Sequence, residues 1–124
     1  MEENTAATFD HREFINVPLN DRGKQAIVGN EYVEFNDDDF KSMEYTLEAH
    51  KAMTWLIFKF NDTFDILIDD FEDEVLPADK VGEALELAKS FGRSAPEKHK
   101  PVIAEFIALL EFARDTNMPV AFNF

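Results

Sequence analysis

The segment WLIFKFNDTFDILID (residues 55–69) decides the fold that the sequence predicts. Its first run, WLIFKF, is rich in the aromatic and β-branched residues that favour strands. Its second run alternates apolar and polar residues, as a strand with one buried face does. Asn61 and Asp62 lie between the two runs as turn residues. We therefore expect a β-hairpin here, with Trp55 in the core because it opens an apolar strand.

Two further strand patterns precede this segment. EFINV (residues 13–17) alternates apolar and polar residues and ends at a proline, which is typical of a short edge strand. Gly29 and Asn30 tolerate positive φ angles, so they can close a hairpin between Gln25–Val28 and Tyr32–Phe35. The sequence thus predicts three strands before the first helix.

Three segments have helical patterns. Asn36 followed by three aspartates is typical of a helix start, and that helix should end near Ala52. Pro77–Gly92 and Ser94–Thr116 repeat apolar residues at spacings of three and four, with capping residues at their ends. Val120–Phe124 then alternates as a closing strand.

The order of these elements, with no βαβ alternation, predicts an α+β fold. We expect a mostly antiparallel sheet of five to six strands with three helices packed on it. The 124 residues, 45% of them hydrophobic, suit one domain spanning residues 1–124, in which residues 1–11 form a tail ordered only if something pins it. The 13 Phe residues predict a core built largely from aromatic rings.

The net charge limits the kinds of partner that the chain can bind. The formal net charge of −14 repels nucleic acid and anionic membranes and attracts cationic proteins. Twelve of these excess negative charges fall in residues 31–79, and residues 80–124 are neutral. Surfaces built only for solubility mix both signs. The absence of interspersed lysines argues for a surface that binds a basic partner, but a charge run is usually solvated surface, so the sequence leaves both interpretations open.

The acidic residues gather in two places. Five carboxylates occur within the six residues 69–74, which follow a predicted strand and so should lie on a loop at one rim of the sheet. Asp37–Asp39 would join the same rim if their helix begins nearby. Aromatic anchors are also needed, and Phe71, Tyr32 and Tyr45 are candidates. The predicted partner-binding residues are Asp69, Asp70, Phe71, Glu72, Asp73, Glu74, Asp37, Asp38 and Asp39.

The sequence lacks the usual patterns of catalytic and metal-binding sites. There is no cysteine, which favours a reducing compartment and argues against a Cys-type zinc site. No calcium loop, phosphate-binding loop or nucleophile motif occurs, and the three His residues have no local partners. No apolar run approaches the length of a membrane span, and the N-terminus lacks signal-peptide features. We expect a cytoplasmic protein that is not an enzyme and has no cofactor or metal.

A small, cysteine-free, acidic α+β domain without a catalytic motif resembles the immunity proteins of bacterial toxin systems. The run WLIFKFNDTFDILIDDFEDEVLP (residues 55–77) and the final VAFNF (residues 120–124) carry this resemblance. It implies a non-catalytic binding protein that neutralises a basic toxin, often a nuclease, by masking its active or substrate-binding surface. The partner would be that toxin domain, with neither nucleic acid nor membrane bound.

Two other functions stay open. A secretion chaperone or adaptor would bind an extended segment of its partner by strand addition at an exposed sheet edge, EFINV or VAFNF, and would usually be a dimer. A phage-type mimic of DNA charge would spread its acids along an elongated surface. The sequence leaves open whether the chain is a monomer or a dimer.

Overall fold

The computed structural model describes residues 12–29, 35–70 and 72–124. Within them lies one antiparallel sheet of four strands in the order β2-β1-β4-β3. These strands are β1 (Phe14–Pro18), β2 (Phe40–Glu44), β3 (Asp73–Leu76) and β4 (Val120–Asn123). The segments EFINV and VAFNF therefore form the two central strands. The prediction that EFINV is an edge strand is wrong, and neither segment offers a free edge for strand addition.

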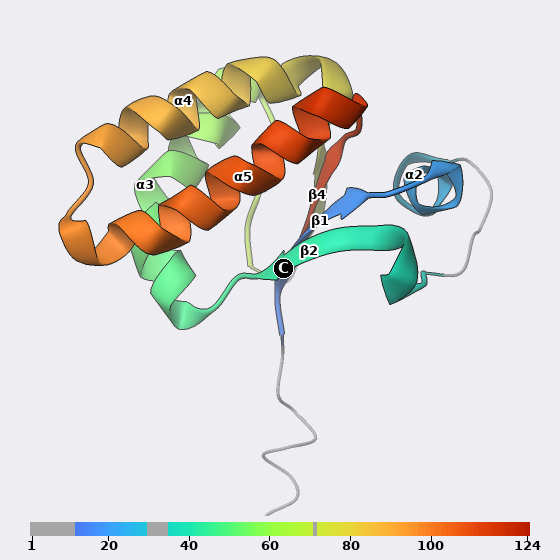
Figure 1. Ribbon diagram of the computed structural model, residues 1–124, viewed down its shortest axis with the longest axis horizontal. Helices are drawn as coiled ribbons and strands as arrows, with labels where there is room; N and C mark the ends of the chain where they lie inside the picture. The colour runs from blue at the N-terminus through green and yellow to red at the C-terminus, as the bar shows by residue number, and fades with distance from the viewer. Residues whose placement is uncertain (1–11, 30–34, 71) are drawn as a thin grey trace, which may run out of the picture.

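Helices cover one face of this sheet. In Figure 1, helices α3 (Leu47–Phe64), α4 (Val81–Arg93) and α5 (Lys100–Thr116) lie together on one side of the strands, and α2 (Asp21–Val28) lies apart from them. Side chains alternate across each strand, so Ile15 and Val17 of β1 face the helices and are fully buried. Asn16 points to the opposite face.

The core contains a chain of aromatic rings that joins the helices to the sheet. Phe60 of α3 lies 6.0 Å from Phe106 of α5, between ring centroids, and Phe106 lies 6.3 Å from Phe122 of β4. Phe124 continues the chain to Tyr45, on which it stacks at 4.4 Å. Phe60, Phe106 and Phe122 are 0% exposed. The prediction of a core built largely from aromatic rings is nevertheless wrong, because only six of the 26 buried hydrophobic residues in the described part of the chain are aromatic.

The α+β class is confirmed, but the element count is wrong. The part of the chain that the structure describes has four strands and four α-helices, where five to six strands and three helices were predicted. The main cause is residues 55–64, which continue helix α3 and form no hairpin. Their buried positions, Leu56, Ile57 and Phe60, extend the helical repeat of Ala49, Ala52 and Met53. Asp65 then ends the helix with a φ of 55°.

The predicted helix from Asn36 to Ala52 is also wrong in its first half. Asn36 does cap a helical turn, accepting a hydrogen bond from the amide of Asp38, but this turn is a single 3-10 turn, Asp37–Asp39. The chain then becomes β2, because Phe40–Glu44 pairs along the whole length of β1. The α-helix begins only at Leu47, where Thr46 caps it by accepting from the amide of Ala49 at 3.1 Å.

The predicted hairpin around Gly29 fails for a local reason. Gln25–Val28 is the second half of α2, which Asn20 starts by accepting a hydrogen bond from the amide of Gly23 at 2.8 Å. Gly29 has a φ of −73° and no hairpin-turn geometry. The second predicted strand, Tyr32–Phe35, lies largely outside the described residues.

From Pro77 onward the structure agrees with the predictions. Before it, the second strand of the predicted hairpin is wrong, since the strand of this region is β3, which begins at Asp73 inside the segment that was expected to be a loop. Helix α4 follows a 3-10 turn after Pro77, and α5 follows another after Pro96, both close to the predicted bounds. Asn117 ends α5 in the left-handed conformation, and β4 closes the sheet. These elements place the chain terminus beside β1 and β3, next to the acidic residues 69–74.

Candidate functional site

The two predicted acidic groups lie at opposite corners of the sheet. Asp37–Asp39 precede the end of β2 that pairs with Pro18, whereas Asp73 starts β3 beside Asn123, which pairs with Phe14 at the other end of β1. Strands β2 and β3 are also the two edges. The eight predicted residues that the structure describes therefore do not form one rim, since Asp37–Asp39 lie apart from the others. Phe71 and Tyr32 lie outside the described residues.

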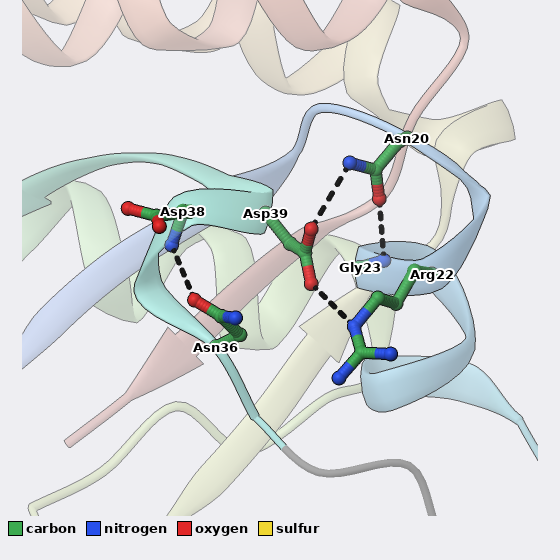
Figure 2. A network of polar contacts seen from close by, with 6 residues as sticks. All are labelled: Asn20, Arg22, Gly23, Asn36, Asp38 and Asp39. Atoms are coloured by element: carbon green, nitrogen blue, oxygen red, sulfur yellow. Dashed lines mark hydrogen bonds and ion pairs between the residues drawn. The ribbon is translucent and has the colours of Figure 1, made fainter.

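Asp39 belongs to an internal network that Figure 2 shows. One carboxylate oxygen accepts from Nε of Arg22 at 3.0 Å, and the other accepts from Nδ2 of Asn20 at 3.1 Å. The carbonyl of Asp39 also accepts from the amide of Leu19 at 2.8 Å. Asp39 thus fastens α2 to β2 and is committed within the fold.

The close approach of the Asp39 backbone to α2 leaves no space for a side chain at Gly23. A Cβ atom there would lie 2.6 Å from the carbonyl oxygen of Asp39. We expect Gly23→Ala to lower the free energy of unfolding by about 1–3 kcal/mol, although alanine has the higher helix propensity. Gly82→Ala is the matched control, since a Cβ there meets nothing within 4 Å, and it should stabilise by about 0.5–1 kcal/mol. Urea unfolding measures both, and a gain in stability at both positions would contradict this packing.

Asp73 and Glu74 are engaged as well. The carboxylate of Asp73 accepts from Asn123 at 3.1 Å, and Asn123 accepts from Asn16 at 2.6 Å. Ser42 donates to Asn16, so this polar ladder crosses all four strands on the face away from α3 to α5. Glu74 accepts from the backbone amides of Leu67 and Val75 at 2.8 and 3.0 Å. Both carboxylates hold the fold together.

Asn61 fixes the segment that leads to the acidic residues. Its side chain accepts from the amide of Ile68 at 2.8 Å and donates to the carbonyl of Ile68 at 3.1 Å. This double hydrogen bond ties residues 65–70 back onto the last turn of α3. It also buries Ile68, which is 3% exposed.

Removing this double hydrogen bond should loosen the acidic segment. We expect Asn61→Ala to lower the free energy of unfolding by about 1–3 kcal/mol, because two backbone groups lose their partners. Hydrogen exchange should accelerate at the Ile68 amide more than at amides of α5. Asp62→Ala, at the exposed neighbour, is the control and should change stability by less than about 0.5 kcal/mol. Equal losses for the two variants would contradict the role of Asn61.

Three acidic residues of the segment stay available for contact: Asp69, Asp70 and Glu72. All three are exposed. Within the described part of the chain, none of them forms an ion pair with Lys or Arg. Hydrogen bonds nevertheless link them to one another and to the last strand. The amide of Phe124 donates to the carbonyl of Glu72 at 3.2 Å, the amide of Glu72 donates to the carbonyl of Asp69 at 3.3 Å, and the amide of Asp70 donates to the Asp69 carboxylate at 2.8 Å. We call the surface formed by Asp69, Asp70 and Glu72 the acidic edge.

A pocket of about 210 Å³ opens beside the acidic edge. Asp69 and Asp70 line one side of it, and the rings of Tyr45, Phe58 and Phe124 line the others. His50 also borders it, with its ring edge-on to Tyr45 at 5.8 Å. Helix α3, the end of β2 and the chain terminus thus meet the acidic edge at one place.

Tyr45 lies at the base of this meeting point. It is 5% exposed, so it is not the exposed anchor for which the sequence made it a candidate. Burial, followed by the negative charges of Glu13 and Asp70, raises the pKa of the Tyr45 phenol well above its usual range. The phenol therefore stays protonated through the neutral range.

This pKa shift makes stability depend on alkaline pH. Unfolded tyrosine releases its proton near pH 10, while folded Tyr45 keeps it to higher pH. Its contribution is therefore complete below about pH 10 and is lost as the pH rises toward the folded pKa, by about 1.4 kcal/mol per pH unit. Denaturant midpoints between pH 9 and pH 11 should fall more steeply for the native chain than for Tyr45→Phe. Equal slopes would contradict the shift.

The sequence prediction missed the aromatic part of this surface. Trp55 was expected in the core, but it is 73% exposed, and it packs edge-on against Phe58, which is 53% exposed, at 5.5 Å between ring centroids. Leu67 nearby in the sequence is 57% exposed. The signal was present in the helical repeat, because a helix that buries residues 52, 53, 56, 57 and 60 turns residues 55 and 58 outward.

Among the described residues, no three His, Asp or Glu side chains gather as metal ligands would. No helix in the described ranges has the length and apolar character of a membrane span. What the site offers is an exposed aromatic ring, that of Phe58, beside two carboxylates that form no ion pair with Lys or Arg in the described structure.

Comparison of the chain with protein-family models, curated proteins and solved structures finds no match in any of the three.

Proposed function

We propose that this protein is a non-catalytic acidic binding protein that acts in the cytoplasm by neutralising a cognate basic toxin domain. It would cover the active or substrate-binding surface of that domain. The observation that carries the proposal is the exposed pair Trp55 and Phe58 on α3, of which Phe58 borders the pocket that Asp69 and Asp70 also line.

The aromatic pair supplies the kind of side chain that dominates binding energy. Interfaces concentrate their energy in a few Trp, Tyr and Arg residues near the centre, surrounded by residues that exclude water. An exposed Trp in contact with an exposed Phe leaves a large apolar area in water, which a soluble chain rarely does without a partner. Covering Trp55 and Phe58 is therefore a direct source of affinity.

The charges select the partner and speed its capture. The acidic edge carries three carboxylates that form no ion pair with Lys or Arg in the described structure, within a chain of net charge −14. Such a field raises the association rate of a basic protein and repels an acidic one. A toxin that acts on nucleic acid has the matching basic surface.

The test is co-expression with the products of the adjacent genes in the native genome. We expect one of them to be toxic alone, to be tolerated with this protein, and to co-elute with it as a stable complex in size-exclusion chromatography. A light-scattering mass for the free chain also separates this function from a dimeric chaperone. Toxicity that persists despite complex formation, or no complex with any adjacent product, would contradict the proposal.

A further inference from the structure

The pocket beside the acidic edge has walls of two kinds. Tyr45, Phe58 and Phe124 present aromatic rings, and Asp69 and Asp70 present carboxylates. None of the described residues that line it is Lys or Arg. Aromatic faces and carboxylates both attract cations, so the two kinds of wall favour the same ligand.

The hydroxyl of Tyr45 has no hydrogen-bond partner within the described chain, although its residue is 5% exposed. A buried hydroxyl without a partner is costly, and most native proteins avoid one. Tyr45 lines both this pocket and a second hollow bordered by Glu13, His50 and Asp70. The phenol oxygen is thus a free acceptor at a place where the carboxylate of Asp70 also lies.

The size of the pocket limits what can enter. Small-molecule sites usually occupy about 300–1,000 Å³, and this pocket has about 210 Å³. It suits one long side chain better than a metabolite. A planar guanidinium fits aromatic and carboxylate walls better than an ammonium, because it stacks on rings and donates in a fork.

We infer that this pocket receives one arginine side chain, which stacks against the aromatic rings and donates hydrogen bonds to Asp70 and the Tyr45 oxygen. The inference rests on the proposed function for its source, since the arginine would belong to the basic partner. The pocket is then the place where the partner is anchored in a defined orientation, and the aromatic pair and the acidic edge flank it.

The direct test uses a small probe and the full chain. N-acetyl-arginine amide is titrated into labelled protein and followed by NMR, in parallel with N-acetyl-citrulline amide, which has nearly the same shape without the charge. We expect saturable shifts at Phe58, Asp70 and Phe124 with a dissociation constant of about 1–10 mM, the range of a single weak contact. The citrulline probe should bind at least about tenfold more weakly.

Two variants locate the binding. Asp70→Asn should weaken the arginine probe by about fivefold or more, and Asp62→Asn, which removes the same charge from an exposed position of α3 outside the pocket, should leave it unchanged. Tyr45→Phe should weaken it by about threefold while stability at pH 7 is retained. Equal binding of both probes, equal effects of both Asp variants, or shifts spread over the whole acidic surface would overturn the inference.

This test and that of the proposed function fail separately. If the protein binds and neutralises a toxic partner but its pocket does not bind the arginine probe, the proposed function stands and the inference about the pocket is wrong. If the pocket binds the arginine probe but no toxic partner exists, the inference about the pocket stands and the proposed function is wrong.

Discussion

The double variant Trp55→Ala, Phe58→Ala is expected to weaken binding of the basic partner by at least about 100-fold. Truncation of a central aromatic anchor costs about 2 kcal/mol or more, and these two rings pack edge-on against each other at 5.5 Å. Most of the change should appear in the dissociation rate, because buried anchors set the residence time. Surface plasmon resonance with the immobilised partner measures both rates.

The fold should tolerate this double variant. Both rings are mostly in solvent, so the free energy of unfolding should change by less than about 1 kcal/mol. Leu19→Ala with Val28→Ala is the matched control, since both residues are large, apolar and roughly half exposed but lie around α2, outside the site. A similar loss of affinity for the control pair, or full affinity for the aromatic pair, would refute the role of α3.

The variant Phe106→Ala should have the largest effect on stability, a loss of about 3–5 kcal/mol in the free energy of unfolding. Phe106 is 0% exposed and lies between Phe60 and Phe122, so it joins α3 to the sheet. Its removal leaves a cavity bordered by rings that cannot all move to fill it. Urea unfolding followed by circular dichroism measures the loss.

Phe58→Ala is the control for this core variant. It deletes the same ring from a position that is 53% exposed, and stability should fall by less than about 1 kcal/mol. If Phe106→Ala cost no more than Phe58→Ala, the aromatic chain would not be the element that binds helices to sheet.

Sequence reasoning succeeded where local signals and tertiary packing agree. Helices α4 and α5 have proline entries, and their apolar stripes match the buried face. Strand β4 lies where its period-two alternation predicted a strand, although both of its faces are buried. In these segments no competing pattern fits the same residues.

Sequence reasoning failed in α3 because two exposed aromatic residues give this helix the sequence pattern of a strand. Trp55 and Phe58 turn a helical stripe into a continuous apolar run, WLIFKF, which periodicity alone cannot distinguish from a buried strand. The residues that misled the prediction are those that the proposed function uses. Departure from the simple pattern of a buried face is what a binding surface requires.

Local sequence patterns could predict neither strand β2 nor the arrangement of the candidate site. Phe40–Glu44 carries no alternation of buried and exposed residues and is a strand because β1 pairs with it. The acidic composition of residues 69–74 was visible in the sequence, but their roles were not. Tertiary hydrogen bonds commit Asp73 and Glu74 to the fold and leave Asp69, Asp70 and Glu72 for contact.

The central claim is that the acidic edge, and not total charge, captures the partner. The most direct test is the association rate of the toxin domain at low and high salt for Asp69→Asn, Asp70→Asn, Glu72→Gln. The control, Asp37→Asn, Asp38→Asn, Glu83→Gln, removes the same three charges from exposed positions elsewhere. At low salt we predict a fall of about tenfold or more for the first variant and less than about threefold for the control. Equal falls for the two variants, or no fall for the first, would contradict the account.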